Sequence, residues 1–325
     1  MTGGRTRDLA LSEARALVQR AIDKAEQLGL AGGIAVVGGS GALVTASRMD
    51  HGGAGGMARA RSKAWIAATQ QVPSTEHLGR MTTLPGPIER GFLLASPEAM
   101  FPGAGGMPIE RDGVVVGGIA TSGATVSPFF PAGIEQERMI ADGRPANPED
   151  LLIAYALGRP YVGQHGDDEE RWRRAFGEFP RDAPRGLGMV DAPPAGDQPE
   201  HDDAVRRSDA VMAAAAREGL RVAVAIVDHR GDPVQQDAMD GAPSAAAFAA
   251  TPVAAAAAGF ALPSEEVAAR YGTGETLAQL SRALPFPILA APGGLPIAED
   301  GRVVAGIGVA GPDPATCRRL AEAGA

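Results

Sequence analysis

Apolar residues recur along the first part of the chain with two different spacings, one helical and one extended. Residues 11–28 place leucine, alanine, valine and isoleucine at helical intervals, which predicts an amphipathic helix. Short apolar runs at 34–37 and 43–47 lie on either side of a glycine-containing turn and predict two strands. A second helix is predicted over about 56–70, and a β-branched strand over 114–120.

The same order of patterns returns later in the chain, with matching residues at matching places. Dipeptides of the first copy recur in order in the second: Met49-Asp50 as Met239-Asp240, Pro73-Ser74 as Pro263-Ser264, Gly105-Gly106 as Gly293-Gly294, and Asp112-Gly113 as Asp300-Gly301. The Asp-Gly dipeptides are strong signals for tight hairpin turns. So many ordered matches indicate an internal duplication of one domain.

Each copy is predicted to be an α+β domain. Strands that are joined through tight hairpins pair antiparallel, and the helices between them pack on the sheet. The predicted boundaries are 1–127 for the first domain, 128–200 for a helical insert and linker, and 201–325 for the second domain.

Two helices are predicted within the insert. Asn147 is a favourable N-cap and Pro148 suits the first helical position, so the first of these helices begins there. A second helix is expected near 167–179. The insert is interpreted either as a strap that packs the two copies together or as a lid over the pocket of one copy. The first helix is expected to have an apolar face formed by Leu151, Leu152, Tyr155 and Ala156.

The composition excludes several classes of function. The net charge is -9 and basic residues form no cluster, which argues against nucleic-acid binding. The single cysteine, Cys317, excludes a disulfide framework or a thiolate metal site within one chain, and no paired histidine spacing indicates zinc. No apolar stretch has the length of a membrane span and no signal core is present, so we expect a cytoplasmic protein without a membrane partner.

Five segments of the first copy, taken in order, carry a resemblance to a known family: Arg48-Met49-Asp50, Lys63-Ala64, Gly105-Gly106-Met107-Pro108-Ile109, Asp112-Gly113 and Gly117-Gly118-Ile119 with Ser122-Gly123. They resemble the GlcG/HbpS-like family, also called the haem-degrading domain family, over residues 9–125 and 202–325. The resemblance implies a profilin-like (GlcG-like) α+β fold for each copy and frequent self-association. It also implies a link to haem or corrinoid handling in some members.

The two copies depart from the family pattern in opposite ways. Three polar residues of the first copy are replaced in the second: Arg48 by Ala238, Lys63 by Val253, and Ser122 by Ala310. Conversely, the second copy keeps Asp228 where the first has Gly38. We therefore expect a pseudo-dimer in one chain, with one working site in the first copy and a degenerate second copy that keeps the fold.

Lys63 and His51 are the candidate catalytic residues. A desolvated Lys63 can act as a base or a Schiff-base nucleophile, although a lysine on a helix also suits a solvated basic face. His51 opens the glycine-rich loop 52–56 and can be a general acid or base, or an axial haem ligand. The alternative for His51 is an exposed histidine in a surface loop. His77 and His201 are both expected to be solvated.

Substrate binding is assigned to residues that surround the lysine in the predicted fold. Arg59 lies one turn before it, and Arg59 and Arg48 are suited to holding a carboxylate or phosphate group. Gly105 and Gly106 allow backbone N–H groups to approach a ligand closely, or they form no more than a tight turn. Ser122, at the end of the last strand, is placed to hydrogen-bond a ligand.

Two functions from different classes follow. The favoured one is a tailoring or catabolic enzyme that transforms a small anionic or aromatic metabolite in the first domain, with no metal, nucleotide or other cofactor. The alternative is a haem- or tetrapyrrole-binding protein for storage, sensing or degradation, and haem is then the cofactor. The aromatic content of 4% weighs against haem, because haem pockets use large apolar walls. A structural module is a third interpretation, and it predicts that the chain's own side chains fill the site.

Overall fold

A computed structural model describes most of the two repeats and a small part of the insert. The residues described are 9–28, 30–96, 98–123, 140–141, 144–145, 147–161, 199–272, 274–284 and 286–325. The chain forms two compact units: unit 1 comprises Met1–Leu43 and His51–Ala192, and unit 2 comprises Val44–Asp50 and Pro193–Ala325. The helix expected near 167–179 lies outside the described residues.

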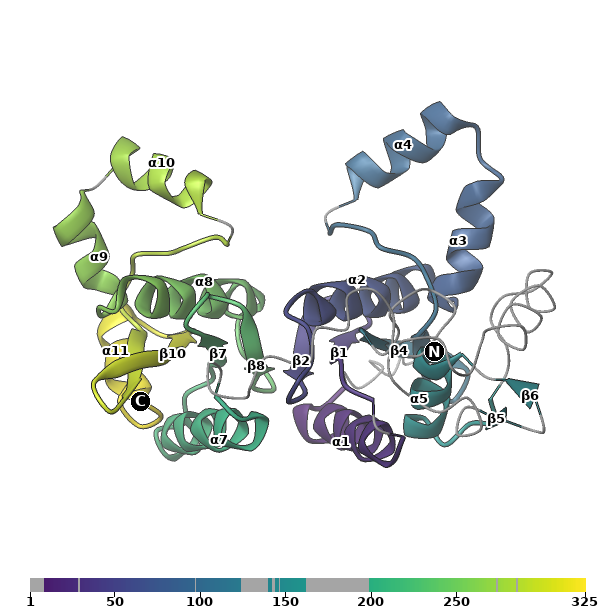
Figure 1. Cartoon of the computed structure of the whole chain (residues 1–325), viewed down its shortest axis with the longest axis horizontal. Coiled ribbons are helices and arrows are strands. Elements are labelled where there is room, and N and C mark those ends of the chain that lie inside the picture. Colours follow the sequence, from purple (N-terminus) through teal and green to yellow (C-terminus); the bar gives the residue numbers. More distant parts are fainter. Residues whose placement is uncertain are drawn as a thin grey trace, which may run out of the picture. The chain divides into compact units, whose positions relative to one another are not determined.

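Unit 1 is built from antiparallel strands with helices packed against them (Figure 1). Its strands lie in the order β3-β4-β1, with bounds β1 Gly33–Gly38, β3 Gly106–Arg111 and β4 Val114–Ser122. Its helices are α1 Leu11–Gln27, α2 Gly55–Gln70, α3 Ser74–Thr82, α4 Gly86–Ala95 and α5 Pro148–Ala156. A short hairpin pairs β5 Ile140–Ala141 with β6 Arg144–Pro145. Helix α2 covers one face of the strands, and α1 packs with α5 on the other.

Unit 2 has the same construction, with one additional strand at its edge. Its strands lie in the order β2-β8-β7-β10-β9, with bounds β2 Leu43–Arg48, β7 Ala223–Asp228, β8 Pro233–Ala238, β9 Gly294–Glu299 and β10 Arg302–Ala310. Its helices are α7 His201–Arg217, α8 Ser244–Phe260, α9 Ser264–Tyr271, α10 Glu275–Ala283 and α11 Pro314–Ala321. Strand β2 comes from the first repeat of the sequence, and its Ser47 pairs with Gln235 of β8.

The two units confirm the predicted α+β class, in which antiparallel strands are packed with helices in each copy. The Asp-Gly turns are confirmed as well, because Asp112 and Gly113 have φ angles of 52° and 75°. Such positive angles at two successive residues belong to the hairpin turn whose twist matches that of the strands. A Cβ at Gly118 would collide with the carbonyl oxygen of Ala64, so glycine lets α2 lie directly on β4.

Helix α5 of the predicted insert is the last helix of the first repeat. It packs against α1, β3 and β4, just as α11 packs against α7, β9 and β10 in unit 2. Both helices have proline in the first turn, after a capping residue: the side chain of Asn147 accepts from the backbone of Glu149, and that of Asp313 accepts from Thr316. The expected helix start is therefore confirmed. Its expected apolar face is partly wrong, because Tyr155 is 45% exposed.

Buried alanines supply much of the core of both units, which is why α2 and α8 approach their strands so closely. In the described part of the chain, no single helix has both the length and the hydropathy to cross a membrane. The bent pair of α8 and α9, at 59° to each other, passes that test of length and composition when taken together.

Candidate functional site

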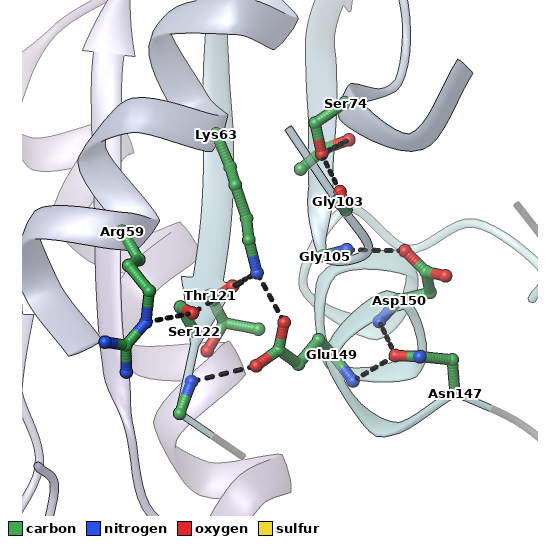
Figure 2. A network of polar contacts seen from close by, with 12 residues as sticks. Arg59, Lys63, Ser74, Gly103, Gly105, Thr121, Ser122, Asn147, Glu149 and Asp150 are labelled. Carbon is green, nitrogen blue, oxygen red and sulfur yellow. Dashed lines mark hydrogen bonds and ion pairs between the residues drawn. The ribbon is translucent and has the colours of Figure 1, made fainter. Parts of the chain in front are cut away.

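Lys63 lies on α2 and points to the end of β4, where its charge is fully enclosed (Figure 2). Its side chain is only 3% exposed. The Nζ atom donates to Glu149 Oε2 at 2.5 Å, to Ser122 Oγ at 3.2 Å and to the carbonyl oxygen of Thr121 at 3.3 Å. An ammonium group has three N–H donors, so these three acceptors satisfy it completely.

The carboxylate that pairs with Lys63 comes from the start of α5, where Glu149 and Asp150 present two adjacent carboxylates (Figure 2). Besides Lys63, Glu149 accepts from the backbone N–H of Gly123, at 2.8 Å on Oε1. Asp150 accepts from the backbone N–H of Gly105, at 2.7 Å on Oδ1. Both side chains stand in the first turn of their helix, where the helix dipole favours negative charge. The carboxylate-binding cluster of unit 1 is therefore Lys63, Ser122 and the N–H groups of Gly105 and Gly123.

Two further residues lie at the outer side of this cluster. Arg59, which is half-buried, donates from Nε to Ser122 Oγ at 3.4 Å, a long hydrogen bond that leaves most of the guanidinium uncommitted to that partner. The ring centroid of Phe101 lies 5.6 Å from Lys63 Nζ, and Phe101 is 48% exposed. The buried ammonium therefore lies one side chain below an exposed aromatic ring.

The structure brings together four of the predicted site residues, Lys63, Arg59, Gly105 and Ser122, and places His51 and Arg48 elsewhere. Gly106 lies beside Lys63 but also faces Ser74, because a Cβ there would lie 2.5 Å from Ser74 Oγ. His51 is exposed and has a φ angle of 64°, in the loop before α2.

Arg48 belongs to unit 2 and not to the cluster around Lys63. Its side chain is 2% exposed and makes an ion pair of 2.7 Å with Asp228 of β7. Its charge is therefore balanced inside that unit. Arg48 was expected among the ligand-binding residues because no local pattern indicates that Asp228 is its partner.

Two histidines that were expected at the surface are buried, so those predictions are wrong. His77 is 4% exposed on α3, and burial together with the charge of Arg80 lowers its pKa. His201 is 8% exposed, because it begins α7 rather than ending a linker, and its backbone N–H donates to Asp50 Oδ1 at 2.9 Å.

Unit 2 reproduces the frame of this cluster without its charges. Val253 stands beside Gly294 as Lys63 stands beside Gly106, and Ala310 replaces the serine. A Cβ at Gly293 would lie 3.1 Å from Cys317 Cβ, whereas a Cβ at Gly105 would lie 2.6 Å from Glu149 Cβ. Cys317 therefore contacts Gly293 as Glu149 contacts Gly105, although the capping residues Asn147 and Asp313 align Glu149 with Ala315. Burial raises the pKa of the Cys317 thiol.

Glu149 and Asp150 are the members of the cluster that the sequence analysis missed. They were placed in the insert, where acidic residues in a first helical turn are ordinary. The available signal was the match between Asn147-Pro148 and Asp313-Pro314, which would have placed α5 at the end of β4. Among the described residues, no three histidine, cysteine or carboxylate side chains gather as a metal site.

Comparison with known proteins identifies the repeat. The family model described as "Haem degrading protein HbpS-like" matches residues 9–127 and 200–325. No curated protein matches the chain. A double mutant of HbpS from Streptomyces reticuli is 29% identical, with 45% of this chain and 96% of that chain covered and a TM-score of 0.38.

Two other solved structures show lower identity to the chain. Protein ORFY of Klebsiella pneumoniae is 22% identical, with 39% of this chain and 87% of that chain covered and a TM-score of 0.36. A PduOC:heme complex is 21% identical, with 39% of this chain and 92% of that chain covered and a TM-score of 0.36.

Proposed function

The chain belongs to the HbpS-like family of haem-degrading proteins, and on that premise we propose that it binds haem or a related tetrapyrrole through unit 1. The sequence alone favoured an enzyme for a small anionic metabolite, with tetrapyrrole binding as the alternative. The family model, which spans both repeats, supports the alternative better.

The observation that carries the choice of unit 1 is the buried pair of Lys63 and Glu149, whose side chains are 3% and 7% exposed. Taking two charges out of water is unfavourable, and apolar residues of similar size are often as stabilising in the same place. Unit 2 provides that apolar version, with Val253 and Cys317 in the same frame. Since the fold does not need the charges, their retention in unit 1 supports a role in ligand binding.

The donors of the cluster have the chemistry that a tetrapyrrole requires. Haem carries two propionate carboxylates, an aromatic plane and an iron atom, which supplies redox chemistry when haem is bound. Lys63 and the N–H of Gly123 already bind a carboxylate, that of Glu149, and Ser122 Oγ accepts a further hydrogen bond from Lys63. Phe101 offers an exposed aromatic face beside them. The exposed His51 is the residue of unit 1 that we assign as the candidate iron ligand.

One observation favours the enzyme interpretation. Lys63 Nζ lies 3.2 Å from Ser122 Oγ, so an amine and a hydroxyl group are adjacent, as in a catalytic pair. A lysine that acts as a base or forms a Schiff base must present a lone pair to its target. Three acceptors around Nζ suit an ammonium group instead. In an enzyme of this kind, Lys63 would therefore hold an anionic substrate rather than react with it.

The test is a haem titration of the full chain, followed through the Soret absorption. We expect saturable binding at one site per chain. The shift of the Soret band that axial ligation causes is expected to be lost in His51→Ala and unchanged in His229→Ala. His229 is the control, because it is a half-buried histidine in a turn of unit 2. Non-saturating absorption that both variants retain would contradict the proposal and return the enzyme interpretation to first place.

A further inference from the structure

Glu149 occupies the cluster in the way a bound carboxylate would. Both of its oxygens are engaged, Oε2 by Lys63 and Oε1 by the backbone N–H of Gly123. Lys63 is 3% exposed, and Ser122, which accepts from it, is also buried, so the ammonium donor is held in a dry and fixed arrangement. Preorganised donors of this kind bind an anion strongly, because little reorganisation is needed when it arrives.

We propose that this cluster is a carboxylate-binding site and that Glu149 is its internal occupant, which the carboxylate of an external ligand displaces. The inference rests on the proposed function in one respect: the external carboxylate is taken to be a propionate of the tetrapyrrole. Glu149 then sets the affinity of unit 1 for its ligand, because every ligand must compete with a carboxylate that is attached to the same chain and has a high effective concentration.

The displacement requires movement of one side chain and not of the helix that carries it. Helix α5 is fixed by Leu152 and Ile153, which are 1% and 0% exposed, and by Arg20, which donates to the carbonyl oxygen of Ala156 at 2.7 Å. In unit 2, α11 stays docked with Cys317 where Glu149 stands. The helix therefore does not depend on the ion pair, and rotation of the Glu149 side chain is sufficient to vacate the donors.

The donor set also defines the class of ligand. The cluster binds the carboxylate of Glu149 through both oxygens, one on the ammonium of Lys63 and the other on the backbone N–H of Gly123. The second carboxylate, that of Asp150, accepts from the N–H of Gly105. A ligand with a terminal carboxylate on a short flexible arm fits this description. Arg59, beside Ser122, lies where a second negative group of the same ligand would arrive.

The first experiment tests the site without haem. Glu149→Ala removes the internal carboxylate, and we expect acetate or propionate at about 100 mM to raise the melting temperature of this variant by about 2–4 °C over chloride at equal ionic strength. Propionamide, which lacks the charge, is expected to give no rise. The wild type and Lys63→Met/Glu149→Ala are the matched controls. A rise in melting temperature in these two proteins as large as that in Glu149→Ala would overturn the site.

The second experiment connects the site to the ligand. Glu149→Gln keeps the shape of the side chain and an acceptor for Lys63, so the unit is expected to remain folded. We expect it to bind haem about tenfold more tightly than the wild type, since the competing charge is gone. Haem dimethyl ester, whose carboxylates are blocked, is expected to bind both proteins equally.

The two proposals fail in different ways. If no variant binds haem but acetate rescues Glu149→Ala, the carboxylate site stands and the tetrapyrrole function is wrong. If haem binds and Glu149→Gln leaves its affinity unchanged or lowers it, the tetrapyrrole function stands and the displacement of Glu149 is wrong. An equal gain for haem and its dimethyl ester also rejects displacement, because the gain would not depend on the ligand's carboxylates.

Discussion

Lys63 and Arg48 are both buried cations, but the partners that balance them lie in different units. Lys63 pairs with Glu149 in unit 1, and Arg48 pairs with Asp228 in unit 2. At the positions equivalent to Asp228 and Arg48, the repeat has Gly38 and Ala238. Neither of these equivalent positions carries a charge, so each charge of the Arg48–Asp228 pair occurs in one repeat only.

The Arg48–Asp228 pair is expected to be structural. Arg48→Met or Asp228→Asn alone leaves one buried charge uncompensated, and each is expected to lower the free energy of unfolding by about 3–5 kcal/mol. The double variant Arg48→Met/Asp228→Asn is expected to recover most of that loss, since both charges are gone and the asparagine oxygen still accepts from the N–H groups of Arg230 and Asp232. Urea unfolding followed by circular dichroism measures this. Single and double variants of equal stability would contradict a structural ion pair.

Sequence reasoning at this scale found single residues better than their partners. Lys63 and Ser122 could be identified because the second repeat is an internal comparison that lacks both. Glu149 could not, because it lies 86 residues from Lys63 and nothing in a local pattern fixes such a contact. Arg48 was grouped with the wrong residues for the same reason, since Asp228 is 180 residues away.

In helix α5, the neighbouring elements determine which face is buried. Its apolar residues Leu152 and Ile153 are buried against α1 and the strands, whereas Tyr155 is 45% exposed. The sequence predicted the start of the helix correctly, because capping is local chemistry. The buried face depends on neighbours from both β4 and α1, so the helical spacing alone did not determine it.

Ile153 is expected to contribute to the stability of unit 1 as a core residue. Ile153→Ala leaves a cavity and is expected to lower the free energy of unfolding by about 2–5 kcal/mol. Tyr155→Ala, on the exposed side of the same helix, is the matched control and is expected to change it by less than about 1 kcal/mol. Differential scanning calorimetry compares the two. Equal effects would mean that α5 is not an integral helix of the unit.

Strand partners were also beyond the sequence pattern. The hairpin signals gave β3 with β4 and β9 with β10, because an Asp-Gly turn joins each pair directly. The assignment of β2 to unit 2, where it pairs with β8, had no such signal. The polar side chains of Thr45 and Asp237 are buried there, with a hydrogen bond of 2.8 Å, so their pairing adds specificity to the register.

Across the whole molecule, the duplication separates the requirement for a stable fold from the requirement for a binding site, which a single domain must meet together. One repeat carries buried charges, and the other shows that the same frame is complete with apolar residues. The difference lies at the equivalent positions 63 and 253 and 122 and 310. It also lies at Glu149 and Cys317, which make the same contact with Gly105 and Gly293. If the charges of unit 1 serve binding, exchanging them for the residues of unit 2 removes function and leaves the fold intact.

The triple variant Lys63→Val/Ser122→Ala/Glu149→Cys makes that exchange. It is expected to unfold within about 1.5 kcal/mol of the wild type, because a buried ion pair is replaced by apolar groups that fit the frame in unit 2. Haem titration is expected to show a loss of at least about tenfold in affinity. The reverse exchange supplies the control: Val253→Lys alone is expected to destabilise the chain by about 3–5 kcal/mol. Adding Ala310→Ser and Cys317→Glu is expected to restore most of it, since the new charge then has its partners. A triple variant that binds haem normally but unfolds easily would show the opposite, that the charges of unit 1 are kept for stability and not for binding.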